Sequence, residues 1–501
     1  MSQINDQELD RLYYVNVGEK GTFKPGKNPI FNSTPEQIDD IFMELKRKGQ
    51  RKIVLYFHGG LVPAQDGLKT AERIKKYVLR DTDAYPISFV WQTGLKETIE
   101  HNLLTIHKSD FFRRLLIRIL KVAGERIGME YSGDLVTAKG GGGLSDAQIQ
   151  AELDKDSPFE GYYRAEGAKS GSLDGSLAWN AELEKTETAE VKAMLEQDIE
   201  ADIRLRDAAA REKPPEEAAL MNQEDLEESP DNSKGIIPSA KLIKGAVEIT
   251  LRVIKRYLQK RDHDFYPTVF EEVCRQYYLS DIGNWVWGGM KEKAALMWKP
   301  SDLQADYRNW TVGYYFIQKL EEYNKHMDGT LSINLIGHSA GSIVICELLE
   351  QLAEQGSTLH FKNVIFMAPA VRCDRFVHSA LKNRSFFDAF RCFTMNDGQE
   401  KKDRMLKMVY PYSLLYFISG ILEEESDAYI LGLQRHISGV APYHGADFDE
   451  IINFLKPDGS IIYAVTELPG ADGLRSGALT HGGFDDEGET TLDSMMYLIK
   501  Q

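Results

Sequence analysis

A serine between two glycines is the part of this chain most typical of a reactive site. Residues 337–341 have the sequence Gly-His-Ser-Ala-Gly, which matches the pattern G-x-S-x-G. In this pattern a tight turn from a strand into a helix lifts the serine hydroxyl above the end of a sheet, and the glycines prevent clashes in the turn. Ser339 is therefore the candidate nucleophile for attack on a carbonyl carbon.

The segments on either side of Ser339 decide what the motif means, because so short a pattern also arises by chance. Residues 331–336 form an apolar run typical of a buried strand, and residues 342–349 form an apolar run suited to a buried helix. The order of strand, turn and helix is the order that an exposed serine nucleophile requires. The flanks therefore favour the chemical interpretation over that of an ordinary turn.

A serine hydroxyl becomes a strong nucleophile only when a base removes its proton, and histidine is the usual base. The chain has 11 histidines. His481 fits best, because it lies in a loop between the last predicted strand and the terminal helix, where a side chain can reach over the strand ends. His444 is the alternative, and His338 is expected to point away from the site. The remaining histidines after the serine are expected at the surface or in the core: His360, His378 and His436.

An acidic residue must hold the imidazole in one tautomer and stabilise its charged form. Asp397 is the candidate, because it follows the predicted strand 391–395 and lies between the serine and His481 in the sequence. Asp374, after the preceding strand, and Glu400, further into the next helix, are the alternatives.

Acyl transfer also needs hydrogen-bond donors for the negatively charged oxygen of the tetrahedral intermediate. Residues 58–61, His-Gly-Gly-Leu, follow a predicted strand and can expose backbone N–H groups because glycine carries no side chain. The amides of Gly60 or Leu61, together with that of Ala340, are predicted to form this oxyanion hole.

These four elements together resemble the α/β-hydrolase superfamily over residues 10–96 and 303–501, and are similar to bacterial esterase- or lipase-like members. The resemblance implies a mostly parallel central sheet flanked by helices. It also implies a serine hydrolase that cleaves a carboxylic ester through a Ser-His-Asp triad and an acyl-enzyme intermediate, without a metal or organic cofactor. Two departures are Leu61 in place of a third glycine and a long insertion in the sheet.

Other functions are compatible with the same motifs. A peptidase or a thioesterase would use the same triad, and a lipid ester is as acceptable a substrate as a small-molecule ester. A protein without catalytic activity could also keep the fold and use its insertion to bind a partner.

Strand-like and helix-like segments alternate at both ends of the chain, which predicts an α/β architecture. The N-terminal segments are 12–17, 34–49, 52–57, 68–79 and 86–92. The C-terminal segments are 314–323, 331–336, 342–354, 361–367, 391–395, 461–466 and 491–499. The predicted hydrolase core therefore has two parts, residues 1–96 and 303–501.

Residues 97–302 interrupt this alternation and are predicted to form a mainly helical lid or insertion, partly disordered. Its segment from about 139 to 236 is acidic and of low complexity: residues 141–235 hold about 24 Asp and Glu against about 10 Lys and Arg. We expect this segment to contribute little core, because it is poor in large apolar residues.

Two helices of the insertion, 112–127 and 240–261, combine apolar faces with basic side chains. Such helices can rest on an anionic membrane, or can bury their apolar faces while the acidic segment covers their basic side chains. Peripheral membrane contact is therefore one hypothesis for these helices.

The composition narrows the class of protein. A formal net charge of -17 disfavours a nucleic-acid partner, because binding a polyanion requires a basic surface. The four cysteines are scattered without the spacing of metal ligands, and the sequence shows neither an N-terminal secretion signal nor a long apolar run. We therefore expect a cytoplasmic protein without a zinc site, and the sequence does not indicate its oligomeric state.

Overall fold

Two compact units make up the chain in the computed structural model. Unit 1 comprises residues 1–97, 288–403 and 429–501, and unit 2 comprises residues 98–287 and 404–428. The structure describes all residues except 1–9, 27–31, 61–63, 92–95, 132–143, 165–172, 175, 212, 223–224, 229–233, 279–282, 458, 467–470, 487 and 489.

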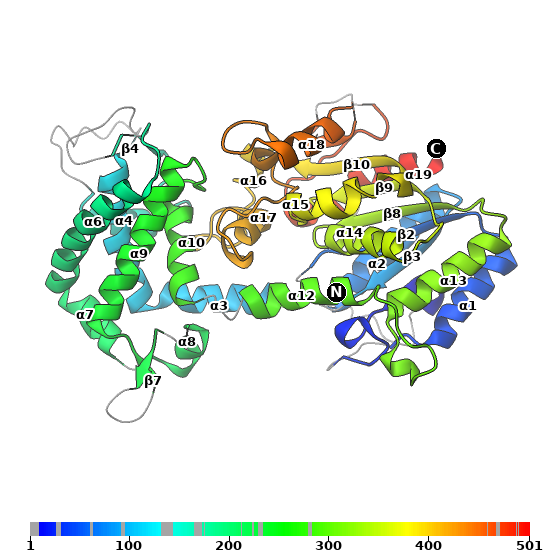
Figure 1. Ribbon diagram of the computed structural model, residues 1–501, viewed down its shortest axis with the longest axis horizontal. Coiled ribbons are helices and arrows are strands. Elements are labelled where there is room, and N and C mark those ends of the chain that lie inside the picture. Colours follow the sequence, from blue (N-terminus) through cyan, green and yellow to red (C-terminus); the bar gives the residue numbers. More distant parts are fainter. Residues whose placement is uncertain are drawn as a thin grey trace. The chain divides into compact units, whose positions relative to one another are not determined.

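The core of unit 1 is a sheet whose seven strands all pair in parallel, in the order β1-β3-β2-β8-β9-β10-β11 (Figure 1). The strands are β1 (Tyr14–Asn16), β2 (Lys52–Phe57), β3 (Tyr85–Val90), β8 (Ser332–His338), β9 (Phe361–Met367), β10 (Phe387–Met395) and β11 (Ile461–Ala464). Their side chains are mostly buried, because helices cover both faces of a parallel sheet. The predicted fold class is confirmed.

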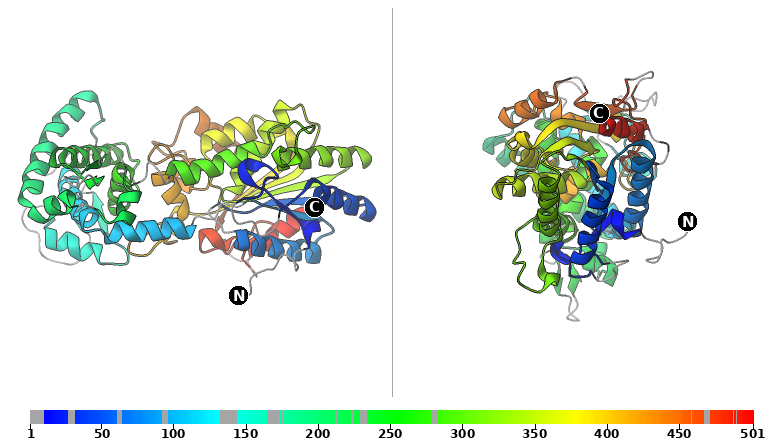
Figure 2. Two further views of the ribbon diagram at one scale, coloured as in Figure 1. Left: turned by 90° about the horizontal axis from the view of Figure 1, so that it is seen from below. Right: turned by 90° about the vertical axis from the view of Figure 1, so that its right-hand side faces the viewer.

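Helices α12, α13 and α14 lie on one side of the sheet, and α2 and α19 lie on the other (Figure 2). The helices of unit 1 are α1 (Pro35–Lys48), α2 (Ala64–Asp81), α12 (Gly289–Leu296), α13 (Val312–His326), α14 (Gly341–Glu354), α15 (Cys373–Phe376), α16 (Asp397–Glu400), α18 (Ala446–Leu455) and α19 (Thr490–Lys500). Helix α1 illustrates how local sequence fixes an end: the Thr34 hydroxyl caps its first turn, and Gly49 ends it in a left-handed conformation.

Unit 2 is mainly helical. Its helices are α3 (Lys96–Lys108, which begins in unit 1), α4 (Asp110–Ile127), α5 (Asp146–Leu153), α6 (Ala181–Ala201), α7 (Ile203–Ala210), α8 (Pro215–Leu220), α9 (Ser239–Leu258), α10 (Phe265–Tyr277) and α17 (Leu414–Phe417). Two small antiparallel pairs complete it: β4 (Met129–Tyr131) with β5 (Tyr162–Arg164), and β6 (Glu227–Glu228) with β7 (Lys234–Ile236). The sequence did not indicate that residues 404–428 belong with the insertion.

The expectation that the acidic segment adds little core is wrong for the part that the structure describes. Helix α6 buries Val191, Leu195 and Ile199 completely and packs against α4 and α9. The apolar residues are few, but they repeat at helical spacing and therefore share one face. Residues 139–143 and 165–172 of the segment lie outside the described residues.

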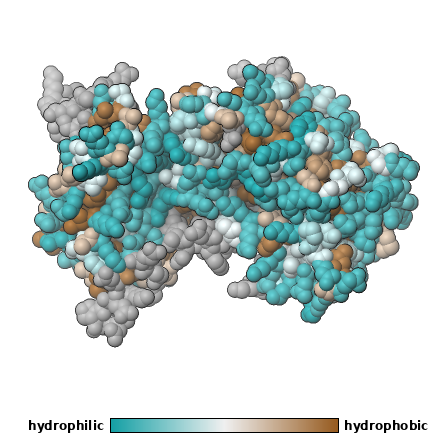
Figure 3. Space-filling model, viewed as in Figure 1, coloured by the Kyte–Doolittle hydropathy of each residue, from teal (hydrophilic) through white to brown (hydrophobic). Residues whose placement is uncertain are grey.

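The acidic segment also neutralises the basic face of α4. Arg118 forms an ion pair with Asp202 (3.1 Å), and Lys121 forms one with Asp198 (2.8 Å). Arg126, which is buried, pairs with Glu187 at 2.7 Å. The apolar residues of both predicted basic helices face the interior of unit 2, and hydrophilic residues predominate on the surface shown in Figure 3. None of the described helices has both the length and the apolar character that a membrane crossing needs.

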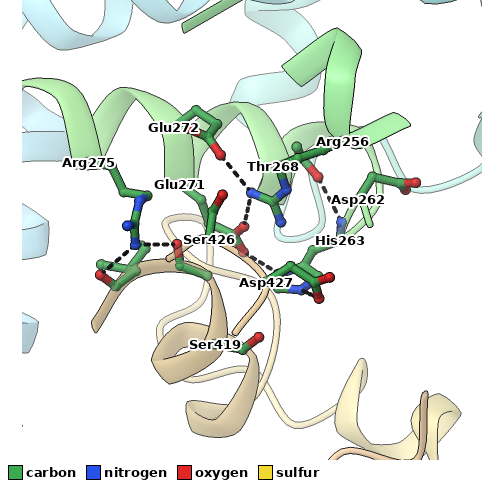
Figure 4. Close-up of polar contacts among 12 residues, drawn as sticks. Arg256, Asp262, His263, Thr268, Glu271, Glu272, Arg275, Ser419, Ser426 and Asp427 are labelled. Atoms are coloured by element: carbon green, nitrogen blue, oxygen red, sulfur yellow. Dashed lines mark hydrogen bonds and ion pairs between the residues drawn. The ribbon is translucent and has the colours of Figure 1, made fainter. Parts of the chain in front are cut away.

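Buried polar contacts attach residues 404–428 to the rest of unit 2 (Figure 4). The Glu271 carboxylate accepts from Arg256 Nη1 at 2.8 Å and from the Tyr410 hydroxyl at 2.6 Å, and lies 2.8 Å from His263 Nδ1. His263 Nε2 in turn lies 3.0 Å from the carboxylate of Asp427. The basic groups lower the pKa of Glu271 against the opposing effect of burial, so this carboxylate is ionised.

Substitution of Glu271 by Gln should lower the free energy of unfolding by about 3 kcal/mol or more, because buried Arg256 would lose one of its two carboxylate partners, Glu271 and Glu272. Urea denaturation followed by tryptophan fluorescence measures the change. Glu248→Gln is the matched control, since Glu248 forms an exposed pair with Lys244 at 3.8 Å and should cost less than about 1 kcal/mol. Equal small losses in both variants would contradict the structural role of Glu271.

Candidate active site

Ser339 occupies the turn between β8 and α14. Its φ of +50° lies in the left-handed region, which non-glycine residues rarely adopt and which marks local strain. The Ser339 amide donates to the carbonyl of Met367 on β9 at 2.8 Å, and the Ser342 hydroxyl donates to the Ser339 carbonyl at 2.6 Å. The strained turn is thus held by a neighbouring strand and by the first turn of α14, as a nucleophile elbow requires.

Close backbone contacts explain both glycines of the motif. A Cβ atom on Gly337 would lie 2.7 Å from the backbone of Gly341. A Cβ atom on Gly341 would lie 2.2 Å from the carbonyl oxygen of Phe57 on β2. Neither separation can be reached by real atoms, so a side chain at either position would push the turn away from the sheet.

The glycine loop after β2 lies directly beside the nucleophile. A Cβ atom on Gly59 would be 3.3 Å from Ser339 Cβ, and one on Gly60 would be 2.9 Å from Ala340 Cβ. Gly60 and Ala340 are two of the three residues predicted for the oxyanion hole, and the structure brings them together. Leu61, the third, lies outside the described residues.

His58 fixes the start of this loop. Burial lowers its pKa to about 4, so the ring is neutral near pH 7. Nδ1 donates to the Gly59 carbonyl at 2.7 Å, and Nε2 accepts from the backbone N–H of Trp91 at 3.2 Å. The indole N–H of Trp91 also donates to the His58 carbonyl at 3.1 Å. The loop is therefore anchored to the end of β3.

The proposed base, His481, begins the short helix η10 (His481–Gly483) and is buried. Its ring centroid lies 5.4 Å from that of His338, the residue next to Ser339. Its amide donates to the Asp403 carboxylate at 2.7 Å, and its carbonyl accepts from His338 Nε2 at 2.9 Å. Asp403 and the last residue of β8, His338, therefore hold the backbone of His481 close to the serine turn.

Asp397 is the first residue of α16, immediately after β10, and its side chain is partly exposed. Lys401 Nζ lies 3.5 Å from its carboxylate. Gln399, two residues further on, donates to the carbonyl of Leu479 at 2.6 Å, so the loop of the proposed acid contacts the loop of the proposed base.

The alternative acids differ in position. Glu400 is completely buried in the same segment as Asp397. Asp374 pairs with Arg372 at 2.9 Å at the start of α15, and its carboxylate is largely exposed. Residues 397–403, which follow β10, thus contact the loop of His481.

The other histidines occupy varied positions. His444 is exposed before α18, and His360 and His378 are exposed partners of Asp388 and Glu350. His436 is buried and accepts from the backbone N–H of Ile430 at 2.9 Å.

His338 does not point away from the site, contrary to expectation. Its side chain lies between the carbonyl of His481 and the carboxylate of Asp485, with Nδ1 3.2 Å from Asp485. Asp485 could not be singled out from the sequence, because the neighbouring acids Asp486 and Glu487 give it no distinguishing pattern. Its one available signal was the short spacing from His481, which only the fold makes meaningful.

Comparison with known protein families gives one match. A family described as "Alpha/beta hydrolase of unknown function (DUF900)" matches residues 315–406, a range that includes the serine turn and Asp397. Comparison with curated proteins and with solved structures gave no significant match.

Proposed function

Since the chain belongs to the α/β-hydrolase superfamily, we propose that it is a serine hydrolase that cleaves carboxylic esters with Ser339, His481 and Asp397. One observation carries this proposal: the strained serine turn lies beside a loop of two glycines, and its neighbour His338 lies beside the buried His481. A nucleophile, its base and a source of backbone donors are thus at the same edge of the sheet. Their order in the sequence, with an acid between serine and histidine, is that of the superfamily.

The reaction follows from these groups. Ser339 Oγ attacks the ester carbonyl carbon while His481 accepts the hydroxyl proton, and Asp397 stabilises the imidazolium that forms. The backbone amides of Ala340 and of Gly60 or Leu61 donate to the oxyanion. His481 then protonates the departing alcohol, which leaves an ester of Ser339. A water molecule, deprotonated by His481, hydrolyses this acyl-enzyme and restores the serine.

The ester is proposed over a peptide because alcohols are better leaving groups than amines. A thioesterase would use the same residues, and a thiol leaves at least as readily as an alcohol. Parallel assays with an ester, a thioester and an amide of one acyl group separate these activities. Specificity for long acyl chains receives no support from α4 and α9, whose apolar faces are buried within unit 2.

Ser339→Ala should abolish covalent labelling by a fluorophosphonate probe and hydrolysis of p-nitrophenyl esters, because the attacking oxygen is removed. His481→Ala should reduce kcat by a similar factor, about 10⁶ in a complete triad. Gel fluorescence and steady-state kinetics measure both effects. The exposed His444 provides the control: activity that survives His481→Ala but not His444→Ala would reject the assigned base.

Asp397→Asn should lower kcat by about 10⁴ and leave fluorophosphonate labelling slow but measurable, since the nucleophile and base remain. Glu400→Gln and Asp374→Asn are the matched comparisons, because they remove the charges of the two alternative acids. A larger loss of kcat in Glu400→Gln than in Asp397→Asn would move the role of the acid to Glu400.

Gly60→Ala should lower kcat about 100-fold, because a methyl group would lie 2.4 Å from Met290 Sδ and 2.9 Å from Ala340 Cβ and displace the donor loop. Gly289→Ala is the control, since a Cβ atom there meets nothing within 4 Å. Kinetics of ester hydrolysis and thermal unfolding should show a fall in kcat with little change in Tm for Gly60→Ala. Equal kcat in both variants would remove this loop from the oxyanion hole.

A further inference from the structure

We propose that His338 and Asp485 form a buried ion pair that positions the loop of the catalytic base. This inference rests on the proposed function, because it assigns His481 the role of base. Neither residue of the pair is a catalytic residue: His338 contacts the backbone of His481, and Asp485 contacts His338. Both are positioning residues, distinct from the Ser-His-Asp triad.

The position of His338 in the sequence gives the pair its importance. His338 is the last residue of β8 and the immediate neighbour of Ser339, so its backbone is as fixed as the serine turn. Its Nε2 donates to the carbonyl of His481 at 2.9 Å. One residue therefore connects the nucleophile to the base through a single hydrogen bond.

Both ring nitrogens of His338 must carry hydrogen in this arrangement. A carbonyl oxygen can only accept, so Nε2 is a donor to His481. Nδ1 lies 3.2 Å from Asp485, and the pKa of that carboxyl is lowered to about 2, so the carboxylate also accepts. A histidine that donates from both nitrogens is an imidazolium, and the pair is ionic.

Asp485 is anchored on two other elements. The hydroxyl of Tyr56 on β2 donates to its carboxylate at 2.5 Å, and Arg73 of α2 lies 3.7 Å away. Burial alone would raise the pKa of Asp485, but the charge of His338 and these partners outweigh it. The carboxylate therefore connects the end of β8 to both the neighbouring strand and the helix on one face of the sheet.

The opposite side of the base loop is also held. The Asp403 carboxylate accepts from the amide of His481 at 2.7 Å, and Gln399 donates to the carbonyl of Leu479 at 2.6 Å. The loop of His481 is thus held by residues 397–403 and by His338. A loss of either set of bonds would let the imidazole of His481 move relative to Ser339.

The pair gives the site a dependence on pH. Burial lowers the pKa of His338, but the adjacent carboxylate of Asp485 outweighs this effect and raises it above the usual 6.5. The ion pair is therefore intact below about pH 6.5 and is lost as the pH rises through the raised value. Neutral His338 has one N–H, which can be donated either to Asp485 or to the His481 carbonyl.

Other titratable groups also surround the pair. They are Tyr56 of β2, His58 of the glycine loop, Arg73 of α2, and His481 and Asp486 of the loop that follows Thr480.

The first test compares Asp485→Asn with Asp486→Asn. The Asp485 variant should lower kcat for p-nitrophenyl ester hydrolysis about tenfold to 100-fold, because a small misplacement of the base slows proton transfer. KM should change little, since neither residue touches the substrate. Asp486→Asn removes a neighbouring charge that is largely exposed and should behave as the wild type. An Asp485→Asn protein with wild-type kcat would overturn the proposal.

The second test separates positioning from simple stability. In His338→Gln the side-chain amide nitrogen takes the place of Nε2 and can still donate to the His481 carbonyl, whereas in His338→Asn it reaches only the place of Nδ1. Both variants lose the ion pair. If the pair contributed only to stability, kcat should fall equally in both variants. The proposal predicts a kcat at least tenfold higher in His338→Gln than in His338→Asn. Equal kcat values would overturn it.

The third test uses the pH profile. The wild-type kcat should decline on the alkaline side as His338 loses its proton. In Asp485→Asn that decline should move to lower pH, because burial, which lowers the pKa of His338, then loses the main charge that opposes it. An unchanged alkaline limb would show that His338 does not control the loop.

A measurement without substrate separates this inference from the proposed function. In ¹³C-histidine-labelled protein, the NMR signal that disappears in His338→Gln should titrate with a midpoint above 6.5. A midpoint at or below 6.5 would overturn the ion pair, whatever the enzyme does. Absence of fluorophosphonate labelling in the wild type would instead reject the proposed function and the positioning role with it.

Discussion

The close approach of the Ser339 turn to strand β2 is the constraint on which the candidate site depends. Gly341 lies so near the carbonyl of Phe57 that only a hydrogen atom fits between the two backbones. This contact holds the start of α14 against the central strands, two residues after Ser339 in its left-handed conformation. The same proximity brings the glycine loop after β2 to the serine. A parallel arrangement of β2 and β8 is what allows both loops to emerge at one edge.

Buried polar groups then hold the loop of His481, the proposed base. Side chains from other segments bind the backbone of the loop that carries His481, at Leu479 and at His481 itself. His338, paired with Asp485, does so at the cost of desolvating two charges, a cost that only close pairing offsets. The benefit is geometric precision, because an ion pair attached to β8 and β2 moves with the sheet.

Unit 2 uses the same physical solution for a different task. Glu271 and Asp427 each place a carboxylate beside a ring nitrogen of His263, and Arg256 pairs with Glu271. These contacts attach residues 404–428 to helices that occur far earlier in the sequence. Since this segment follows Asp403 directly, the chain passes from the loop that contacts His481 into unit 2 and then returns to unit 1 at Tyr429.

The sequence by itself determined the elements whose signals are local. The motif around Ser339 follows from glycine sterics, and the strands follow from apolar runs, so the elbow, the parallel sheet and the glycine loop could be predicted. The partners of His338 and Glu271 could not, because Asp485 and Tyr410 are distant in sequence and carry no periodic pattern. The core formed by α6 was also missed, since acidic composition concealed a regularly spaced apolar face. Tertiary structure decided these features because the free energy of a buried charge depends on its neighbours in space.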